Sequence, residues 1–228
     1  MTKDDTKESL LKVAERLFSK KGYQAVSTRE LAEAAGVNLG AIQYHFGSKD
    51  KLFIKTVNRM MEGGACTQAG AALAGETKTR EEAGVKLASY IQGFLSNLLC
   101  PTGPHAFRLV FREVFSDPES NEEMFEAMVS STVENYIRPV VSDLVKVLAV
   151  LKPEAKDQEL RRTAASVAGQ CSFYATHQPF LERLENKKYS TEKACNEAAQ
   201  HICSFTLKAL GCEEELINRS LAKAFEKK

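Results

Sequence analysis

The chain has 228 residues and a mass of 25.2 kDa, which is enough for one large domain or for a small domain joined to a larger one. Its 43% hydrophobic residues, 27% charged residues and 6 prolines argue against a disordered chain. No stretch reaches the ~20 apolar residues of a membrane-spanning helix, and the first residues carry acids where a signal peptide has an apolar run. We therefore expect a globular protein that is neither secreted nor inserted into a membrane.

The formal net charge of +1 conceals a difference between the two ends of the chain. Residues 1–55 carry 10 Lys and Arg against 7 Asp and Glu, whereas the rest carries 21 against 23. A basic segment on a slightly acidic body is typical of a protein with an anionic partner, although charge alone does not decide it.

Apolar residues recur three and four positions apart, and no run alternates cleanly between apolar and polar, so we predict an all-α fold. The first helix is expected to begin behind Asp5 and Thr6 as candidate caps and to end at Gly22. Its apolar stripe consists of Leu10, Leu11, Ala14, Leu17 and Phe18.

Two short helices are predicted next, at about residues 28–35 and 39–45, on either side of Gly36, Val37 and Asn38. Leu31, Ala32, Ala35, Val37, Ile42 and Phe46 form a candidate buried face. Helices this short need support from the first helix, and Gly36 supplies a tight turn between them. The pattern predicts a helix-turn-helix motif, whose second helix enters the DNA major groove.

The fourth helix is expected to begin at Ser48 and run toward residues 73–75. Gly63 and Gly64 interrupt it at a cost of roughly 1 kcal/mol each relative to Ala, and we interpret them as a seam between two functional parts. Breakers are Pro101, Pro104, Pro118, Lys152-Pro153, Pro179 and residues 185–188. They predict helices near 79–99, 104–116, 120–151, 154–178, 190–210 and 213–227, with Pro139 kinking or splitting the third of these.

The segment from Gly22-Tyr23 to Leu52, with AAGVNLGAIQYHFGSKDKL at its centre, resembles the DNA-binding domain of the TetR family of transcriptional repressors. The resemblance implies a helix-turn-helix domain at residues 1–55 and a helical-bundle domain for ligand binding and dimerisation at 56–228. It also implies repression that a small molecule relieves. HAFRLVFREVFSDPES, Tyr136-Ile137-Arg138-Pro139 and Gly169-Gln170-Cys171 more loosely resemble the subgroup with a CerR-like C-terminal domain.

Several residues are candidates for contacts with DNA phosphates. Thr28 and Arg29 begin the first motif helix, where a hydroxyl, backbone N–H groups and a guanidinium can meet a phosphate, although Thr28 also suits an N-cap. Tyr44, His45 and Lys49 match the family's residues that reach the DNA backbone, but packing roles remain an alternative for Tyr44 and His45. Such contacts position the protein without selecting a base sequence.

Base selection is expected from the exposed positions at the start of the recognition helix, namely Asn38, Leu39, Gly40, Ala41 and Gln43. Gln43 departs from the Tyr common in the family. A Gln can bridge N6 and N7 of adenine, which is worth roughly 1 to 3 kcal/mol of discrimination.

The inducer is expected to be an apolar or aromatic small molecule, because the stretch 91–111 is rich in Phe and poor in charge. The candidate ligand-binding residues are Phe94, Phe107, Arg108, Phe111, Arg112, Met124, Tyr136, Gln170, Phe173, Tyr174 and His177. A role in the core is the alternative for most of them. A structural pair of Arg112 with Glu113 is the alternative to an anion site.

A homodimer is expected through the helices near 154–178 and 190–210, because two recognition helices would then read an inverted repeat. The candidate small-residue stripes are Leu160, Ala164, Val167, Ala168 and Cys171, with Ala194, Cys195, Ala198, Ile202 and Phe205. A purely intramolecular core is the alternative.

No catalytic motif is evident, so we expect no enzyme and no cofactor. The six cysteines contain no CxxC pair, which predicts reduced thiols in a cytoplasmic protein. The spacing of Cys195, His201 and Cys203 matches no common zinc pattern. The alternative function is a helical adaptor that binds only protein, and it leaves Tyr44, His45 and Lys49 unexplained.

Replacing Gln43 with Ala should weaken binding to operator DNA more than binding to a duplex in which the contacted adenine is substituted, because the bidentate contact exists only with adenine. Equal losses of affinity on both duplexes would contradict base readout by Gln43.

Overall fold

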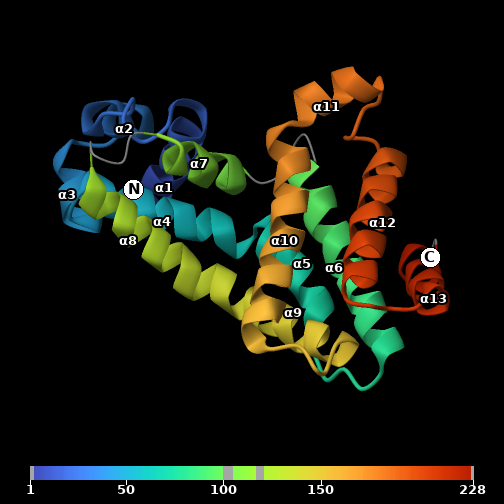
Figure 1. Ribbon diagram of the computed structural model, residues 1–228. Coiled ribbons are helices and arrows are strands. Elements are labelled where there is room, and N and C mark those ends of the chain that lie inside the picture. Colours follow the sequence, from blue (N-terminus) through green and yellow to red (C-terminus); the bar gives the residue numbers. More distant parts are fainter. Residues whose placement is uncertain (1–2, 100–104, 117–120, 227–228) are drawn as a thin grey trace. The chain divides into compact units, whose positions relative to one another are not determined.

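A computed structural model describes residues 3–99, 105–116 and 121–226, and within these ranges the regular structure is helical, with no strand (Figure 1). The predicted all-α fold is confirmed. No helix in the described ranges has the length and apolarity needed to cross a bilayer. Cys100, the breakers Pro101, Pro104 and Pro118, and the predicted helix starts at 104 and 120 lie outside the described residues.

The chain divides into two compact units, one formed by residues 1–64 and 104–135 and the other by residues 65–103 and 136–228. One crossing point between the units follows Gly64, at the glycine pair interpreted as a seam. The functional division expected between residues 55 and 56 stays a prediction.

The first unit consists of two short helices and four longer ones. Its helices are α1 (Lys3–Lys21), α2 (Thr28–Ala35), α3 (Gly40–Phe46), α4 (Lys49–Glu62), α7 (His105–Val114) and α8 (Glu122–Thr132). The two short helices, α2 and α3, pack against α1 and α4. The buried rings of Phe18 and Tyr23 each pack edge-on against Phe53, with ring centroids 5.0 and 5.1 Å apart. This aromatic cluster joins α1, the loop after it and α4, while α7 and α8 pack along α4.

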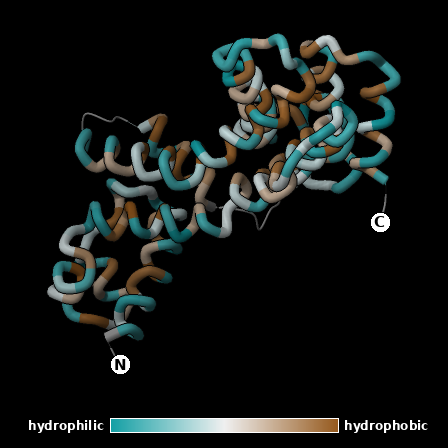
Figure 2. Tube along the Cα trace, turned by 90° about the horizontal axis from the view of Figure 1, so that it is seen from below, coloured by the Kyte–Doolittle hydropathy of each residue, from teal (hydrophilic) through white to brown (hydrophobic). Residues whose placement is uncertain are grey.

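The second unit is built around α6 (Arg80–Leu99), which contacts α5, α9, α10, α12 and α13. The other elements are α5 (Ala65–Gly70), the 3₁₀ turn η1 (Ala71–Leu73), α9 (Arg138–Leu151), α10 (Asp157–Thr176), α11 (Gln178–Glu185), α12 (Glu192–Ala209) and α13 (Glu214–Phe225). Hydrophobic and hydrophilic residues are interspersed along the helices of both units, as expected of amphipathic helices (Figure 2).

Several predicted helix boundaries need correction. Asp5 and Thr6 lie inside α1 and do not cap it. The fourth helix stops at Glu62, and the expected continuation is the separate helix α5 followed by η1. Pro139 splits the predicted segment 120–151, because a π-helical turn (η3, Val133–Ile137) precedes it and Pro139 opens α9.

Helix α11 is absent from the sequence prediction. Pro179, which the sequence indicates as a breaker, lies in the first turn of α11, where its missing N–H has no partner to lose. Asn186 then ends the helix with a positive φ of 49°.

Small residues allow close approach of helices in the second unit. A Cβ added to Gly84 of α6 would lie 2.1 Å from Oγ and 2.9 Å from Cβ of Ser220, which is fully buried on α13. A Cβ on Gly70 would meet a methyl group of Val140 at 2.8 Å. Gly84 therefore sets the distance between α6 and α13.

The free energy of unfolding of the Gly84→Ala variant should be about 1 to 3 kcal/mol lower than that of the wild type, because overpacking outweighs the gain in helix propensity. Gly93→Ala on the same helix is the control, since its added Cβ would meet Ala69 at an ordinary 3.7 Å. Chemical denaturation of both variants measures the difference. Equal free energies of unfolding of the two variants would show that Ser220 moves aside without a loss of stability.

Candidate nucleic-acid interface

The turn between α2 and α3 has the geometry that the sequence predicts. Gly36 ends α2 in the left-handed region at φ 67° and donates its N–H to the carbonyl of Glu33 at 3.1 Å. The N–H of Val37 donates to the carbonyl of Ala32 at 3.0 Å, which closes the helix end. Only glycine adopts this conformation without strain, so Gly36 directs the chain into α3.

The N-terminus of α2 is capped by Ser27, whose hydroxyl accepts the N–H of Glu30 at 3.1 Å. Thr28 is therefore the first helical residue and not the cap. Arg29 is exposed and forms an ion pair with Glu33, with Nε and Oε1 2.8 Å apart. Such an exposed pair contributes little stability, so the guanidinium can exchange its partner for a phosphate.

The exposed face of α3 matches most of the residues proposed to contact bases. Asn38, Gly40 and Gln43 are exposed, and Leu39 is 56% exposed although it is a large apolar side chain. Ala41, which the sequence predicts to be exposed, is 9% exposed and packs toward the core beside Ile42. Its burial follows from the packing of α3 against α1, α2 and α4.

Tyr44 is 69% exposed, which rules out the alternative of a core tyrosine. Its ring packs edge-on against His45, with centroids 5.0 Å apart, and His45 is half-buried. Val37 and Phe46, expected in the buried face, are also half-buried.

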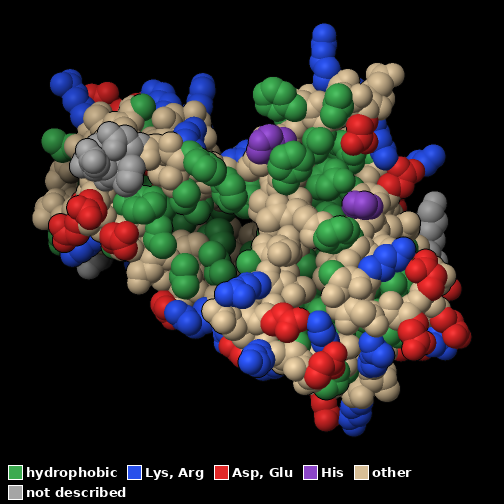
Figure 3. Space-filling view, in the orientation of Figure 1, with side chains coloured by type: hydrophobic (Ala, Val, Ile, Leu, Met, Phe, Trp, Pro, Cys, Tyr) green, Lys and Arg blue, Asp and Glu red, His purple; other side chains and the backbone are tan. Residues whose placement is uncertain are grey.

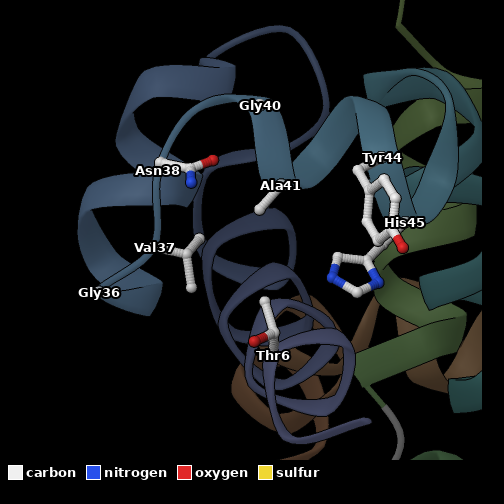
Figure 4. A pocket seen from close by; sticks show the side chains of 8 residues that line it. All are labelled: Thr6, Gly36, Val37, Asn38, Gly40, Ala41, Tyr44 and His45. Atoms are coloured by element: carbon white, nitrogen blue, oxygen red, sulfur yellow. The ribbon is translucent and has the colours of Figure 1, made fainter. Parts of the chain in front are cut away.

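An open depression of about 440 Å³ lies between the start of α1 and α3 (Figure 4). It is lined by Thr6, Gly36, Val37, Asn38, Gly40, Ala41, Tyr44 and His45. Figure 4 shows Thr6 on α1 opposite Ala41 of α3. Sequence reasoning missed Thr6 as a surface residue of this site, because only the tertiary packing of α1 brings it beside α3.

Lys49 lies at the start of α4, behind the N-cap Ser48, whose hydroxyl accepts the N–H of Lys51 at 3.1 Å. The ammonium of Lys49 is 4.0 Å from the centroid of the Tyr23 ring, within the range of a cation–π interaction. Burial lowers the pKa of Lys49, and the nearby carboxylates of Asp50 and Glu113 oppose this shift. The cation at the start of this helix is thus partly desolvated.

The candidate ligand-binding residues are divided between the two units. Arg108, Phe111, Arg112 and Met124 belong to the first unit, and Phe94, Tyr136, Gln170, Phe173, Tyr174 and His177 belong to the second. The ring of Phe111 lies tilted against those of Phe107 and Phe115, with centroids 4.3 and 5.7 Å away. Met124 and Phe94 are buried at 5% and 7% exposure and serve the core.

Arg112 has a structural role that the ligand hypothesis did not anticipate. Its Nη2 donates to the carbonyl oxygens of Phe18 at 2.7 Å and of Ser19 at 3.0 Å. Both carbonyls belong to the last turn of α1, and that of Phe18 also accepts the N–H of Gly22 at 2.8 Å. The alternative pairing with Glu113 is weak, at 4.0 Å between Nε and Oε1.

The small-residue stripes predicted for dimerisation face the core of the single chain. Leu160, Ala164, Val167 and Cys171 on α10, and Ala194, Cys195, Ala198 and Ile202 on α12, are at most 5% exposed. The other two members of the stripes differ, because Ala168 is half-buried and Phe205 is 58% exposed. Burial raises the pKa of the Cys171 thiol to about 12 and that of Cys195 to about 11.

Apart from Ile137 in η3, the large exposed apolar side chains in the described part of the second unit lie on α10 to α12. They are Phe173, Phe180, Leu184 and Phe205, between 48% and 83% exposed. His177 stacks on Phe173 with ring centroids 4.4 Å apart. Figure 3 shows hydrophobic side chains gathered over these helices with histidine beside them. We call Phe173, Phe180, Leu184 and Phe205 the outer apolar face.

Residues 10–56 match the family model described as bacterial regulatory proteins, tetR family. Residues 83–210 match the model for the C-terminal domain of the HTH-type transcriptional dual regulator CecR. The second match corresponds to the C-terminal resemblance that the sequence suggested as CerR-like.

Curated relatives match over only part of the chain. The HTH-type transcriptional regulator AcrR of Shigella flexneri is 49% identical over 49 residues, 22% of this chain and 23% of that protein. The probable HTH-type transcriptional regulator YttP of Bacillus subtilis is 32% identical over 111 residues, 49% of this chain and 51% of that protein. The matched region thus spans about a quarter to a half of these relatives.

Solved structures share the fold over most of the chain. A putative fatty acid metabolism regulator from Clostridium perfringens has a TM-score of 0.59 at 16% identity, covering 88% of this chain and 97% of that one. AibR, solved in complex with isovaleryl coenzyme A and operator DNA, has a TM-score of 0.57 at 14% identity and the same coverages. Since family models match both the helix-turn-helix segment and more than half of the chain, the chain belongs to the TetR family of bacterial regulatory proteins.

Proposed function

We propose that this protein is a transcriptional regulator that binds an inverted-repeat operator as a dimer and is released by a small molecule. The observation that carries the proposal is the surface of α3. Asn38 and Leu39 lie exposed in the turn that leads into α3, Gln43 and Tyr44 are exposed on α3 itself, and the tetR family model covers this segment. Exposed polar and apolar side chains on such a helix suit the edges of base pairs in the major groove.

The residues around α3 supply contacts with the DNA backbone. Arg29, His45 and Lys49 lie on α2, at the end of α3 and at the start of α4, respectively, and the exposed ring of Tyr44 lies beside His45. Phosphate contacts of this kind fix the orientation of the recognition helix. AibR was solved in complex with operator DNA, which supports the same class of partner for this chain.

Dimerisation is proposed to use the outer apolar face in place of the predicted stripes. A patch of large apolar side chains on one side of a unit is typical of a protein interface. A two-fold dimer presents two copies of α3 to successive major grooves about 34 to 36 Å apart. Phe173 lies on α10 and Phe205 on α12, the two helices that the sequence analysis selected, whereas Phe180 and Leu184 lie on α11, which it did not predict.

The inducer is proposed to be an apolar or aromatic small molecule. The neighbouring rings of Phe107 and Phe111 on α7 and of Phe115 directly after it provide an aromatic surface for the inducer. The ligand is proposed to bind better to a conformer in which the two recognition helices are wrongly spaced for the operator. The ligand then lowers the affinity for DNA, and DNA lowers the affinity for the ligand by the same factor. The glycine pair Gly63-Gly64, between α4 and α5, is the proposed site of the motion.

Selection of duplexes from a random pool by the purified protein tests DNA recognition. We expect enrichment of an inverted repeat and an affinity that falls as salt rises, because phosphate contacts release counterions. A duplex with one half-site scrambled is the control and should bind much more weakly. Absence of enrichment with only weak, salt-sensitive binding would contradict the proposal and favour the adaptor.

Combined Phe180→Glu and Phe205→Glu substitutions should convert the dimer into a monomer, because two buried carboxylates would face the partner without a counter-charge. Phe115→Glu is the matched control, since Phe115 is also exposed, at 78%, but belongs to the first unit. Sedimentation equilibrium measures the association. A double variant that remains dimeric would place the interface elsewhere.

A further inference from the structure

Tyr23, in the loop between α1 and α2, is 5% exposed and makes polar contacts with three helices. Its N–H donates to Oε1 of Glu113 on α7 at 3.0 Å. Its hydroxyl donates to Asp50 on α4 and accepts a hydrogen bond from Nδ2 of Asn121 at 3.0 Å. Burial, followed by the hydrogen bond to Asp50, raises the pKa of Tyr23, so the phenol keeps the proton that it donates.

Arg112 and Glu113 of α7 contact this loop closely. Glu113 is 4% exposed, although a carboxylate is rarely buried without a partner. A Cβ on Gly22, whose φ is 82°, would lie 3.2 Å from Nε of Arg112 and 3.3 Å from Oε1 of Glu113. Gly22 therefore lets Arg112 and Glu113 approach the backbone of the loop. Tyr23 is thereby fixed by its backbone as well as by its ring.

Asn121 connects the same tyrosine to α8. Its Oδ1 caps α8 by accepting the N–H of Met124 at 3.3 Å, while its Nδ2 reaches the hydroxyl of Tyr23. The ring of Tyr23 thus lies between Asn121, Asp50 and the aromatic cluster, with the ammonium of Lys49 4.0 Å from its centroid. This ammonium therefore lies over the face of the ring.

We propose that Tyr23 is a positioning residue, held by Glu113 of α7 and by Asn121, that fixes the ammonium of Lys49 for a DNA phosphate. This inference rests on the proposed function, because it assumes that Lys49 meets the backbone of DNA. A cation already held in place loses little side-chain freedom on binding. Glu113, which is 90 positions beyond Tyr23 in the sequence, thereby contributes to DNA affinity without touching DNA.

Two conservative variants test the link. Tyr23→Phe keeps the ring but loses the hydroxyl, and Asn121→Ser keeps an N-cap for α8 but is too short to reach Tyr23. Each should weaken binding to the selected operator by about two- to ten-fold, the range expected when one long side chain must be ordered on binding. The loss should be alike on all sequences, since phosphate contacts do not select bases.

A double-mutant cycle with Lys49→Met separates positioning from a general structural effect. In the Lys49→Met protein, Tyr23→Phe should cause no further loss of affinity. In an Arg29→Ala protein, which lacks a different phosphate contact, Tyr23→Phe should cause its full loss. Equal losses with and without Lys49, or no loss from either single variant, would overturn the proposal.

A second measurement on the protein without DNA keeps the two hypotheses apart. In an NMR spectrum of the protein with its lysines labelled at Cε, the Lys49 signal is the one that disappears in Lys49→Arg. Its chemical shift should lie upfield of the other lysine signals because of the ring current of Tyr23. Asn121→Ser should move it toward the other lysines. An unmoved signal overturns the positioning role, whereas a moved signal in a protein that selects no operator leaves positioning intact and refutes the proposed function.

Discussion

Helices of seven and eight residues do not persist in water, so α2 and α3 depend on the hydrophobic surface against which they pack. That surface is provided by α1 and α4, which the rings of Phe18, Tyr23 and Phe53 join to each other. Leu31 and Ile42 are buried at 0% and 3% exposure where the short helices meet this support. Burying such side chains contributes about 1.5 to 3 kcal/mol each, more than the intrinsic propensity of so short a helix. The position of the exposed face of α3 therefore depends on the aromatic cluster behind it.

The same dependence extends beyond the helix-turn-helix segment, because α7 and α8 pack in the first unit with α1 and α4. Arg112 supplies donors to the carbonyls at the end of α1, and Glu113 accepts the next free N–H, that of Tyr23. A helix end and the loop after it leave several backbone groups without partners. Arg112 and Glu113, two consecutive residues far along the sequence, supply partners for some of these groups. Helix α7 therefore contacts the end of α1 and the loop that leads into α2 directly.

In the second unit the small residues have a different use from the one that the sequence suggested. Ala164, Ala194 and Ala198 are buried inside the chain, so their stripes allow α10 and α12 to approach neighbouring helices of the same subunit. Gly84 against Ser220 follows the same principle on α6 and α13. Stripes of small residues indicate that a helix packs closely, but they do not say whether its neighbour belongs to the same subunit. The large exposed side chains Phe180, Leu184 and Phe205 identify the face that remains without a partner within the unit.

The sequence by itself determined the all-α class, the positions of α2 and α3, the Gly36 turn and the exposure of Asn38, Leu39 and Gln43, because these follow from local periodicity and backbone conformation. Tertiary structure decided what no local pattern records: the burial of Ala41, the use of Pro179 to begin α11, the capping of α1 by Arg112 and the contacts of Tyr23 with Glu113 and Asn121. Each depends on which distant segment packs against the residue. Side-chain period and turn chemistry are properties of neighbours in sequence, whereas burial and hydrogen-bond partners are properties of neighbours in space.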